Sequence, residues 1–279
     1  MFTRWPVTPT LDTDEVVDLL LDCTMHLVKL AERVGRRPAA ASVVLAEEGD
    51  EATGFASIVG ERHWRGVPVR TWLEEDLELP VTVGHEVRAG ALAEALLGAG
   101  RGSRALLYVP VGDRLPAAII LDGQAGDGHR SVVGDLGRLP TWTTCDAGTR
   151  GAERVEDIAS ASAVTRRYES AGGEAGLSAL AVHQRAKAGD ADAARVWGDA
   201  IEAFADALAS AATMLSPDRV VVGGEFAEAG KAYFRQLRRA VAARVQSPLV
   251  IVPAQLGFQG SLLGAALLTR EARATVQPR

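Results

Sequence analysis

The 279-residue sequence contains no asparagine and, of its 30 basic residues, only three are lysines, which leaves 27 arginines. Any mechanism that depends on an asparagine side chain is therefore excluded. A GC-rich coding sequence explains the excess of arginine and alanine, so this bias alone indicates no function. The two cysteines, Cys23 and Cys145, are too few for the disulfide framework of a small secreted domain.

The sequence also lacks a basic charge balance and any long apolar run. Its formal net charge of −6 argues against general nucleic-acid binding, which requires a basic face. No stretch approaches the length of apolar sequence that spans a bilayer. The opening MFTRWPVTPT is followed by the charged LDTDEVVD instead of a signal segment. We therefore expect a cytoplasmic protein without direct membrane or nucleic-acid contacts.

The sequence does contain an alternation of helical and strand-like segments. Helices are predicted over 11–35, 67–77, 87–98, 153–169, 176–188, 190–215, 230–246 and 259–274, and strands over 41–48, 80–83, 104–112, 116–123, 219–225 and 248–254. The glycine-rich stretch from 123 to 152 is predicted to be irregular. The alternation predicts an α/β fold. An N-terminal lobe is expected over 1–103, joined by the helix at 259–274, and a C-terminal lobe over 104–258.

Five stretches of this chain occur in a recognisable order. They read VTVGHEVRAGALAE, VVGDLGRLP, CDAGTRGAERVED, DRVVVGGEFAEAG and QGSLLGAALL. In this order they resemble the ROK family, which comprises bacterial sugar kinases and sugar-responsive repressors. The resemblance implies a two-lobe, actin-like (ribonuclease H-like) sugar kinase fold. The family's opening D-x-G-G-T turn has no counterpart, so a truncated N-terminal sheet is expected, with a misplaced start as the alternative.

The resemblance places a second phosphate-binding turn at residues 112–118, where the family has G-T-G-I-G-G-G. This chain reads GDRLPAA there. Pro116 has no N–H to donate, and Asp113 would put a negative charge beside an anion. The chain therefore differs from the family in both phosphate motifs, the opening D-x-G-G-T turn and this second turn, and the two changes are independent. Three glycines remain as weak candidates for nucleotide contacts: Gly112 in this turn, and Gly223 and Gly224 in the turn that would face adenosine.

The resemblance also implies positions for the catalytic base and for the sugar contacts. Glu86 stands where the family has its catalytic aspartate, and its extra methylene can displace the carboxylate by about an ångström, which costs on the order of 100-fold in rate. The alternative is that Glu86 is only an acidic residue at the start of a helix, where its negative charge suits the helix dipole. The ligand-binding candidates are His85, Gly60, Asp135 and Arg138, where the family has Asn, Asn, Glu and His.

The zinc site that the family builds from one histidine and three cysteines is expected to be lost. The corresponding residues are Arg138, Cys145, Ala147 and Ala152, so one ligand of four remains. A tetrahedral structural zinc site needs all four ligands. No metal is therefore predicted, and Cys145 is interpreted as an ordinary thiol.

The apolar pattern persists while the polar positions differ, which predicts a non-catalytic pseudokinase. It would act as a ligand sensor or protein-interaction module, with no cofactor, and as a homodimer, as is common in the family. The alternative is an ATP-dependent sugar or amino-sugar kinase with a remodelled site that uses Glu86, ATP and magnesium. A transcriptional regulator is a third interpretation, although the sequence leaves no room for a DNA-binding segment.

Four of the polar candidates carry or can carry charge: His85, Glu86, Asp135 and Arg138. Together they predict a polar pocket of mixed charge between the lobes. Such a pocket suits a sugar-like ligand that bears an acidic or a basic group better than it suits a plain hexose.

Overall fold

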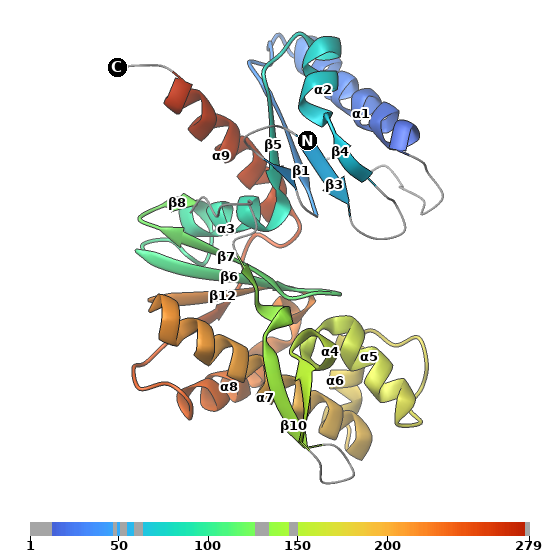
Figure 1. Ribbon diagram of the computed structural model, residues 1–279, viewed down its shortest axis with the longest axis vertical. Coiled ribbons are helices and arrows are strands. Elements are labelled where there is room, and N and C mark those ends of the chain that lie inside the picture. The colour runs from blue at the N-terminus through green and yellow to red at the C-terminus, as the bar shows by residue number, and fades with distance from the viewer. Residues whose placement is uncertain are drawn as a thin grey trace. The chain divides into compact units, whose positions relative to one another are not determined.

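The computed structural model describes residues 13–46, 49–50, 55–58, 64–125, 134–144 and 150–276. The chain divides into two compact units, and Figure 1 shows their elements. Unit 1 consists of Met1–Ala89, Asp127–Val132 and Ser261–Arg279, and unit 2 of Gly90–Gly126 and Val133–Gly260. The predicted α/β class is confirmed. The predicted boundary near residue 103 falls inside unit 2.

Unit 1 combines helices with two small sheets. Its elements are α1 (Thr13–Arg33), β1 (Ala41–Leu45), β2 (Gly49–Asp50), β3 (Phe55–Ile58), β4 (Trp64–Val67), α2 (Val69–Leu77), β5 (Val81–His85), the start of α3 (Glu86–Leu97) and most of α9 (Gln259–Val276). The strands β1 and β5 pair in parallel, and β2, β3 and β4 form an antiparallel sheet.

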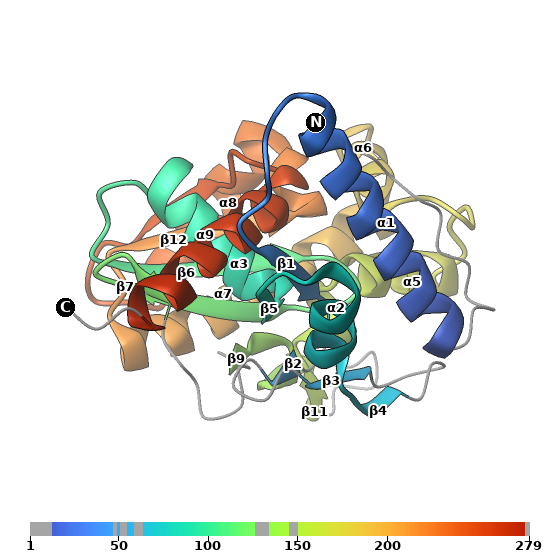
Figure 2. The same ribbon diagram turned by 90° about the horizontal axis from the view of Figure 1, so that it is seen from above.

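One apolar cluster holds the two helices of unit 1 against the parallel strand pair. Val17 of α1 and Val69 and Leu73 of α2 pack with Val43 of β1 and Val83 of β5. The apolar residues of α1 recur at three- and four-residue spacings, so one face of the helix reaches this cluster. Figure 2 shows α1 and α2 on the same side of β1 and β5.

Unit 2 is built on a larger mixed sheet. Its elements are β6 (Ala105–Val111), β7 (Pro116–Leu121), β8 (Gln124–Ala125), β9 (Gly134–Asp135), η1 (Leu136–Arg138), β10 (Pro140–Thr144), β11 (Arg150–Arg154), α4 (Glu156–Ala159), α5 (Ala161–Ser170), α6 (Ala179–Lys187), α7 (Ala191–Leu215), β12 (Arg219–Gly224), η2 (Glu225–Glu228), α8 (Gly230–Ala242) and β13 (Val250–Pro253). The strand order is β13-β12-β6-β7-β8, with β9 beside β7.

The core of unit 2 lies between this sheet and its helices. Val109 of β6 and Val222 of β12 pack in one cluster with Trp197, Phe204 and Leu208 of α7. The sheet joins parallel and antiparallel pairs, because β12 runs parallel to β6 and β13 whereas β7 runs antiparallel to β6. Figure 1 shows α7 and α8 on one face of the sheet and α3 on the other. None of the described helices has an apolar stretch long enough to cross a membrane.

The prediction of an irregular region from 123 to 152 is wrong. The described part of this region contains β8, β9 and η1, and β10 begins a hairpin with β11. The sequence PTWTT of β10 is rich in β-branched and aromatic residues, which favour a strand, but the surrounding glycines obscure the pattern. The helix predicted over 153–169 is also interrupted, because the Ser160 side chain accepts the Ala163 N–H at 3.1 Å and begins α5.

A buried carboxylate fixes the C-terminal part of α3 within unit 2. Glu94 is 1% exposed, and its Oε2 accepts the Ala99 N–H at 2.8 Å. Its Oε1 accepts the N–H groups of Gln255 and Leu256 at 2.8 and 2.7 Å. These bonds join α3 to the loop after β13. They give a physical reason why this part of α3 belongs with the second unit rather than with the residues before it.

The end of β12 requires glycine. Gly224 has φ 65° and ψ −156°, a region of backbone conformation that is essentially restricted to glycine. A Cβ atom at this position would lie 2.2 Å from the carbonyl oxygen of Val111 on the neighbouring β6. The close approach of the two strands therefore excludes any side chain here.

We expect Glu94→Ala to lower the free energy of unfolding by roughly 3–5 kcal/mol, because one buried and two partly buried hydrogen bonds lose their charged acceptor. Glu94→Gln should cost less, since one oxygen can still accept. Urea unfolding of both variants measures this. The exposed Glu75→Ala on α2 is the control, with an expected change within about 0.5 kcal/mol. A loss below about 1 kcal/mol for Glu94→Ala would contradict the assignment.

Gly224→Ala is expected to destabilise the chain by more than about 3 kcal/mol, because it combines a steric clash with a disfavoured backbone conformation. Gly230→Ala is the matched control, since Gly230 also has a positive φ but no atom lies within 4 Å of its Cβ position. That control should cost only about 1–2 kcal/mol. Thermal unfolding of both variants tests the difference, and equal losses would show that the contact with Val111 does not matter.

Candidate functional site

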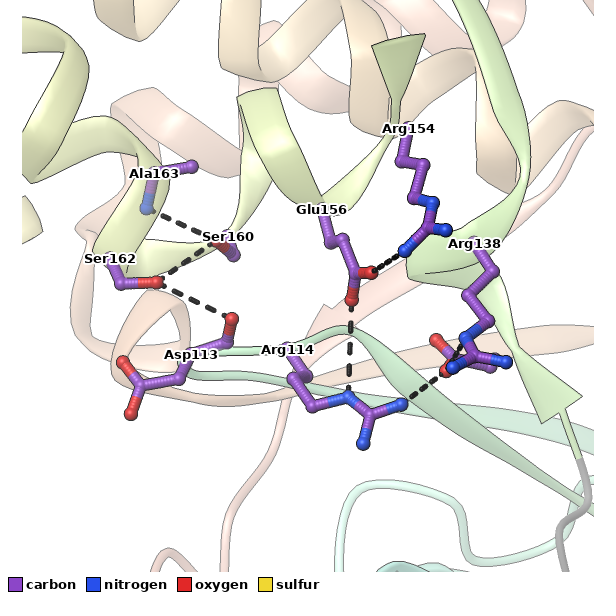
Figure 3. A network of polar contacts seen from close by, with 9 residues as sticks. Asp113, Arg114, Arg138, Arg154, Glu156, Ser160, Ser162 and Ala163 are labelled. Carbon is purple, nitrogen blue, oxygen red and sulfur yellow. Dashed lines mark hydrogen bonds and ion pairs between the residues drawn. The ribbon is translucent and has the colours of Figure 1, made fainter. Parts of the chain in front are cut away.

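The turn between β6 and β7 is closed by its own backbone. The Gly112 N–H donates to the Arg114 carbonyl at 3.2 Å, and the Ala161 N–H donates to the Gly112 carbonyl at 2.8 Å. The Ser162 hydroxyl donates to the Asp113 carbonyl at 3.4 Å, as Figure 3 shows. These bonds tie the turn to the start of α5. Pro116, which follows the turn, has no N–H to donate.

Five charged residues beside this turn form what we call the arginine network: Arg114, Asp135, Arg138, Arg154 and Glu156. Asp135 Oδ2 lies 2.6 Å from Arg114 Nη2 and 3.4 Å from Arg138 Nε. Glu156 lies 3.9 Å from Arg114 Nε through Oε2, and 3.6 Å from Arg154 Nη1 through Oε1. Arg114 therefore bridges the two carboxylates, as Figure 3 shows in part.

The network has a carboxylate interior and a guanidinium exterior. The side chains of Asp135 and Glu156 are 16% and 15% exposed, whereas those of Arg114, Arg138 and Arg154 are 52%, 66% and 60% exposed. Asp135 Oδ1 is buried and has no hydrogen-bond partner in the described part of the chain. The surface of the network is therefore cationic.

The structure brings Asp135 and Arg138 together, as η1 follows β9 directly. The sequence reasoning missed Arg154 and Glu156 as members of this group. The family stretch that CDAGTRGAERVED resembles, C-x-C-G-x-x-G-C-L-E, ends with a glutamate where this chain has Arg154. Glu156 had no comparable motif, because only the return of the β10–β11 hairpin brings it to the turn.

His85, the last residue of β5, lies directly before helix α3. It is 8% exposed, and its Nδ1 accepts the Val87 N–H at 3.1 Å. An N-cap side chain normally accepts from the second or third helical residue, and His85 makes that bond with an imidazole. Nδ1 is therefore unprotonated in this arrangement, and the ring proton is on Nε2.

Glu86 is the first residue of α3 and is partly buried. Burial raises the pKa of the Glu86 carboxyl above its ordinary value, because loss of water disfavours the charged form. The helix N-terminus acts in the opposite sense, since its dipole favours a negative charge. A raised pKa suits a general base as well as a residue that is merely desolvated.

The glycine candidates for nucleotide contacts have different surroundings. A Cβ at Gly223 would lie 2.6 Å from the Tyr108 hydroxyl oxygen, and one at Gly224 would strike Val111. Packing within the sheet therefore explains both glycines without a nucleotide. Nothing lies within 4 Å of a Cβ at Gly112. Gly60 is outside the described residues.

The remaining candidates fall into separate groups. His85 and Glu86 belong to unit 1, whereas Asp135 and Arg138 belong to unit 2. At the positions that correspond to the family's zinc ligands, Arg138 is paired with Asp135, whereas Cys145 and Ala147 are outside the described residues. No cluster of three or more His, Cys, Asp or Glu side chains that could hold a metal occurs among the residues described. The loss of zinc therefore stays a prediction.

The chain is similar to proteins of one family. The glucokinase of Halalkalibacterium halodurans is 27% identical over 240 residues, which cover 78% of this chain and 72% of that protein. The structure of a ROK hexokinase from Thermus thermophilus has a TM-score of 0.78 and 27% identity, and the match covers 97% of this chain and 90% of that one.

A ROK family transcriptional regulator, described as a homologue of the E. coli MLC protein, has a TM-score of 0.80 with 21% identity. That match covers 93% of this chain and 69% of the regulator. At this identity the likeness shows the fold alone. The predicted actin-like sugar kinase fold is thereby confirmed. The sequence pattern of the ROK family matches residues 8–272, and the chain therefore belongs to the ROK family.

Proposed function

We propose that this chain is a non-catalytic ROK protein, a pseudokinase that acts as a ligand sensor or protein-interaction module. The observation that carries the proposal is the closed turn at Gly112–Leu115. A kinase of this fold must present backbone N–H groups or cations to the phosphates of its nucleotide. Here the Gly112 N–H is bonded to Arg114 within the turn, and Pro116 has no N–H.

The charges at the turn support the same proposal. Arg114 is the cation within the turn, and its guanidinium is paired with the carboxylates of Asp135 and Glu156. Asp113 is exposed and adds a negative charge to the turn. An approaching nucleotide phosphate would therefore meet the Asp113 carboxylate at the turn, beside an Arg114 guanidinium that already pairs with two carboxylates.

The alternative function is an ATP-dependent sugar or amino-sugar kinase with a remodelled site. The specific observation that favours it is Glu86, because a carboxylate with a raised pKa at the start of a helix could accept a proton from a sugar hydroxyl. Similarity to a glucokinase and to a hexokinase also supports it. Only this alternative requires ATP and magnesium.

The proposal extends to the setting in which the protein acts. We propose a cytoplasmic homodimer that binds a small sugar-like ligand and makes no direct contact with nucleic acid or membrane. The acidic net charge of −6 supports the absence of nucleic-acid contact. Light scattering of the purified chain measures the oligomeric state.

The deciding measurement is calorimetric titration of the chain with magnesium-ATP, followed by a coupled assay for phosphate transfer to glucose and to amino sugars. We expect no saturable ATP binding and no turnover. As a positive control, the glucokinase relative should bind and turn over under the same conditions. Saturable ATP binding with turnover would establish the kinase alternative instead.

Glu86→Gln tests the burial of the Glu86 carboxyl through the pH dependence of stability, and its turnover separates the two functions. The raised pKa means that the folded state holds the proton of Glu86 more tightly than the unfolded chain does. The stability that this tighter proton binding contributes is fully present below the pKa of Glu86 in the unfolded chain. It is lost as the pH rises through the pKa of Glu86 in the folded state. The variant should therefore be more stable than the parent near pH 7, but not at about pH 4.

Thermal unfolding at the two pH values measures this difference. Equal stability of variant and parent near pH 7 would contradict the burial cost of the Glu86 charge. In the kinase alternative, the same variant would also lose at least about 100-fold in turnover because the base is removed. A non-catalytic chain has no turnover to lose, so the two functions predict different results.

A further inference from the structure

We propose that the arginine network binds the anionic group, a carboxylate or a phosphate, of a small sugar-like ligand. The inference rests on the sensor function proposed above and adds the chemical class of the ligand. Of the two classes that the polar candidates allow, an acidic and a basic ligand, the arrangement of the network selects the acidic one.

The first argument is the layering of charge in the network. The side chains of Asp135 and Glu156 are at most 16% exposed, and all three arginine side chains are more than half exposed. A ligand that approaches from solvent therefore meets cations first. A basic ligand would need the opposite order, with carboxylates outside.

The second argument is the balance of charge. Three guanidinium groups pair with two carboxylates, which leaves the network with a net charge of +1 in a chain whose formal net charge is −6. Figure 3 shows the Asp113 carboxylate on the opposite side of the turn from the Arg114, Arg138 and Arg154 guanidinium groups. Glu153, the neighbour of Arg154, pairs with Arg167. Asp113 and Glu153 take part in none of the four ion pairs of the network.

The third argument is the hydrogen-bonding capacity of the outer arginines. Among the described residues, Arg138 makes one ion pair, through Nε to Asp135, and Arg154 makes one, through Nη1 to Glu156. A guanidinium offers a planar fork of N–H donors that matches a carboxylate or a phosphate in a bidentate manner. The inner carboxylates hold each fork by one edge, which orients the other N–H groups and lowers the entropy cost of binding.

The ligand series that tests this inference consists of glucose 6-phosphate, glucuronate, glucose and inorganic phosphate, each titrated into the full chain by calorimetry. We expect glucose 6-phosphate or glucuronate to bind at least tenfold more tightly than glucose and inorganic phosphate, and the affinity to fall with added salt. Preference between the two anionic sugars identifies the group as a phosphate or a carboxylate.

Variants of the outer arginines assign the binding to the network. Arg138→Gln and Arg154→Gln should each weaken binding of the preferred anionic sugar at least tenfold. Both side chains are largely exposed, so the variants should fold, and thermal unfolding checks this. Arg138→Lys keeps the charge without the fork and should lose an intermediate amount. Arg195→Gln is the matched control, since Arg195 is an exposed arginine paired with acids on α7, and it should change binding less than twofold.

Several results would overturn the inference. In the titrations, these are an anionic sugar that binds no more tightly than glucose, and the absence of binding by every probe. Inorganic phosphate that binds as tightly as the sugars would indicate an adventitious ion only. In the variants, unchanged binding of the anionic sugar by both Arg138→Gln and Arg154→Gln would also overturn the inference. Failure here differs from failure of the proposed function. If neither magnesium-ATP nor the anionic sugars bind, the anion site is ruled out, but the proposal of a protein-interaction module remains. If the chain turns over ATP and its binding of the anionic sugar depends on Arg138 and Arg154, the anion site is supported but the non-catalytic function is ruled out.

Discussion

The carboxylate of Glu94 is the interaction on which the organisation of unit 2 depends. A buried negative charge is costly unless donors surround it, and Glu94 has three backbone N–H groups as partners. Two of them belong to the loop between β13 and α9, far along the chain from α3. This single side chain therefore joins a helix near the start of the unit to the loop at its end.

The residues around the candidate site follow a different rule. Gly223 and Gly224 are required by contacts between neighbouring strands, and His85 is required by the first turn of α3. The members of the arginine network, in contrast, are mostly exposed and pair mainly with one another. Exposed pairs of this kind contribute little to stability. The network is therefore where the surface chemistry of the chain can change without loss of the fold.

The sequence predicted most of the regular structure because apolar periodicity marks long helices and buried strands. It failed for β10 and β11, whose strand character depends on their pairing with each other. The family resemblance made Asp135 and Arg138 candidates, but it could not point to Glu156, because no motif predicts which residues a hairpin brings back to a turn. The roles of Gly223 and Gly224 were ambiguous for a related reason. A glycine in a sequence does not reveal whether a ligand or a neighbouring strand occupies the space beside it.

The division of the chain has a consequence for its synthesis. Unit 1 contains residues 1–89 but also Ser261–Arg279, and a Cβ at Gly264 of α9 would lie 1.8 Å from the Ala89 carbonyl oxygen. The last helix therefore packs directly on the backbone near the start of α3. At usual translation rates the ribosome needs about 10–30 s to make the intervening unit. Unit 1 is thus completed only after unit 2 has been made, and until then the surface that α9 covers is exposed to chaperones and to other nascent chains.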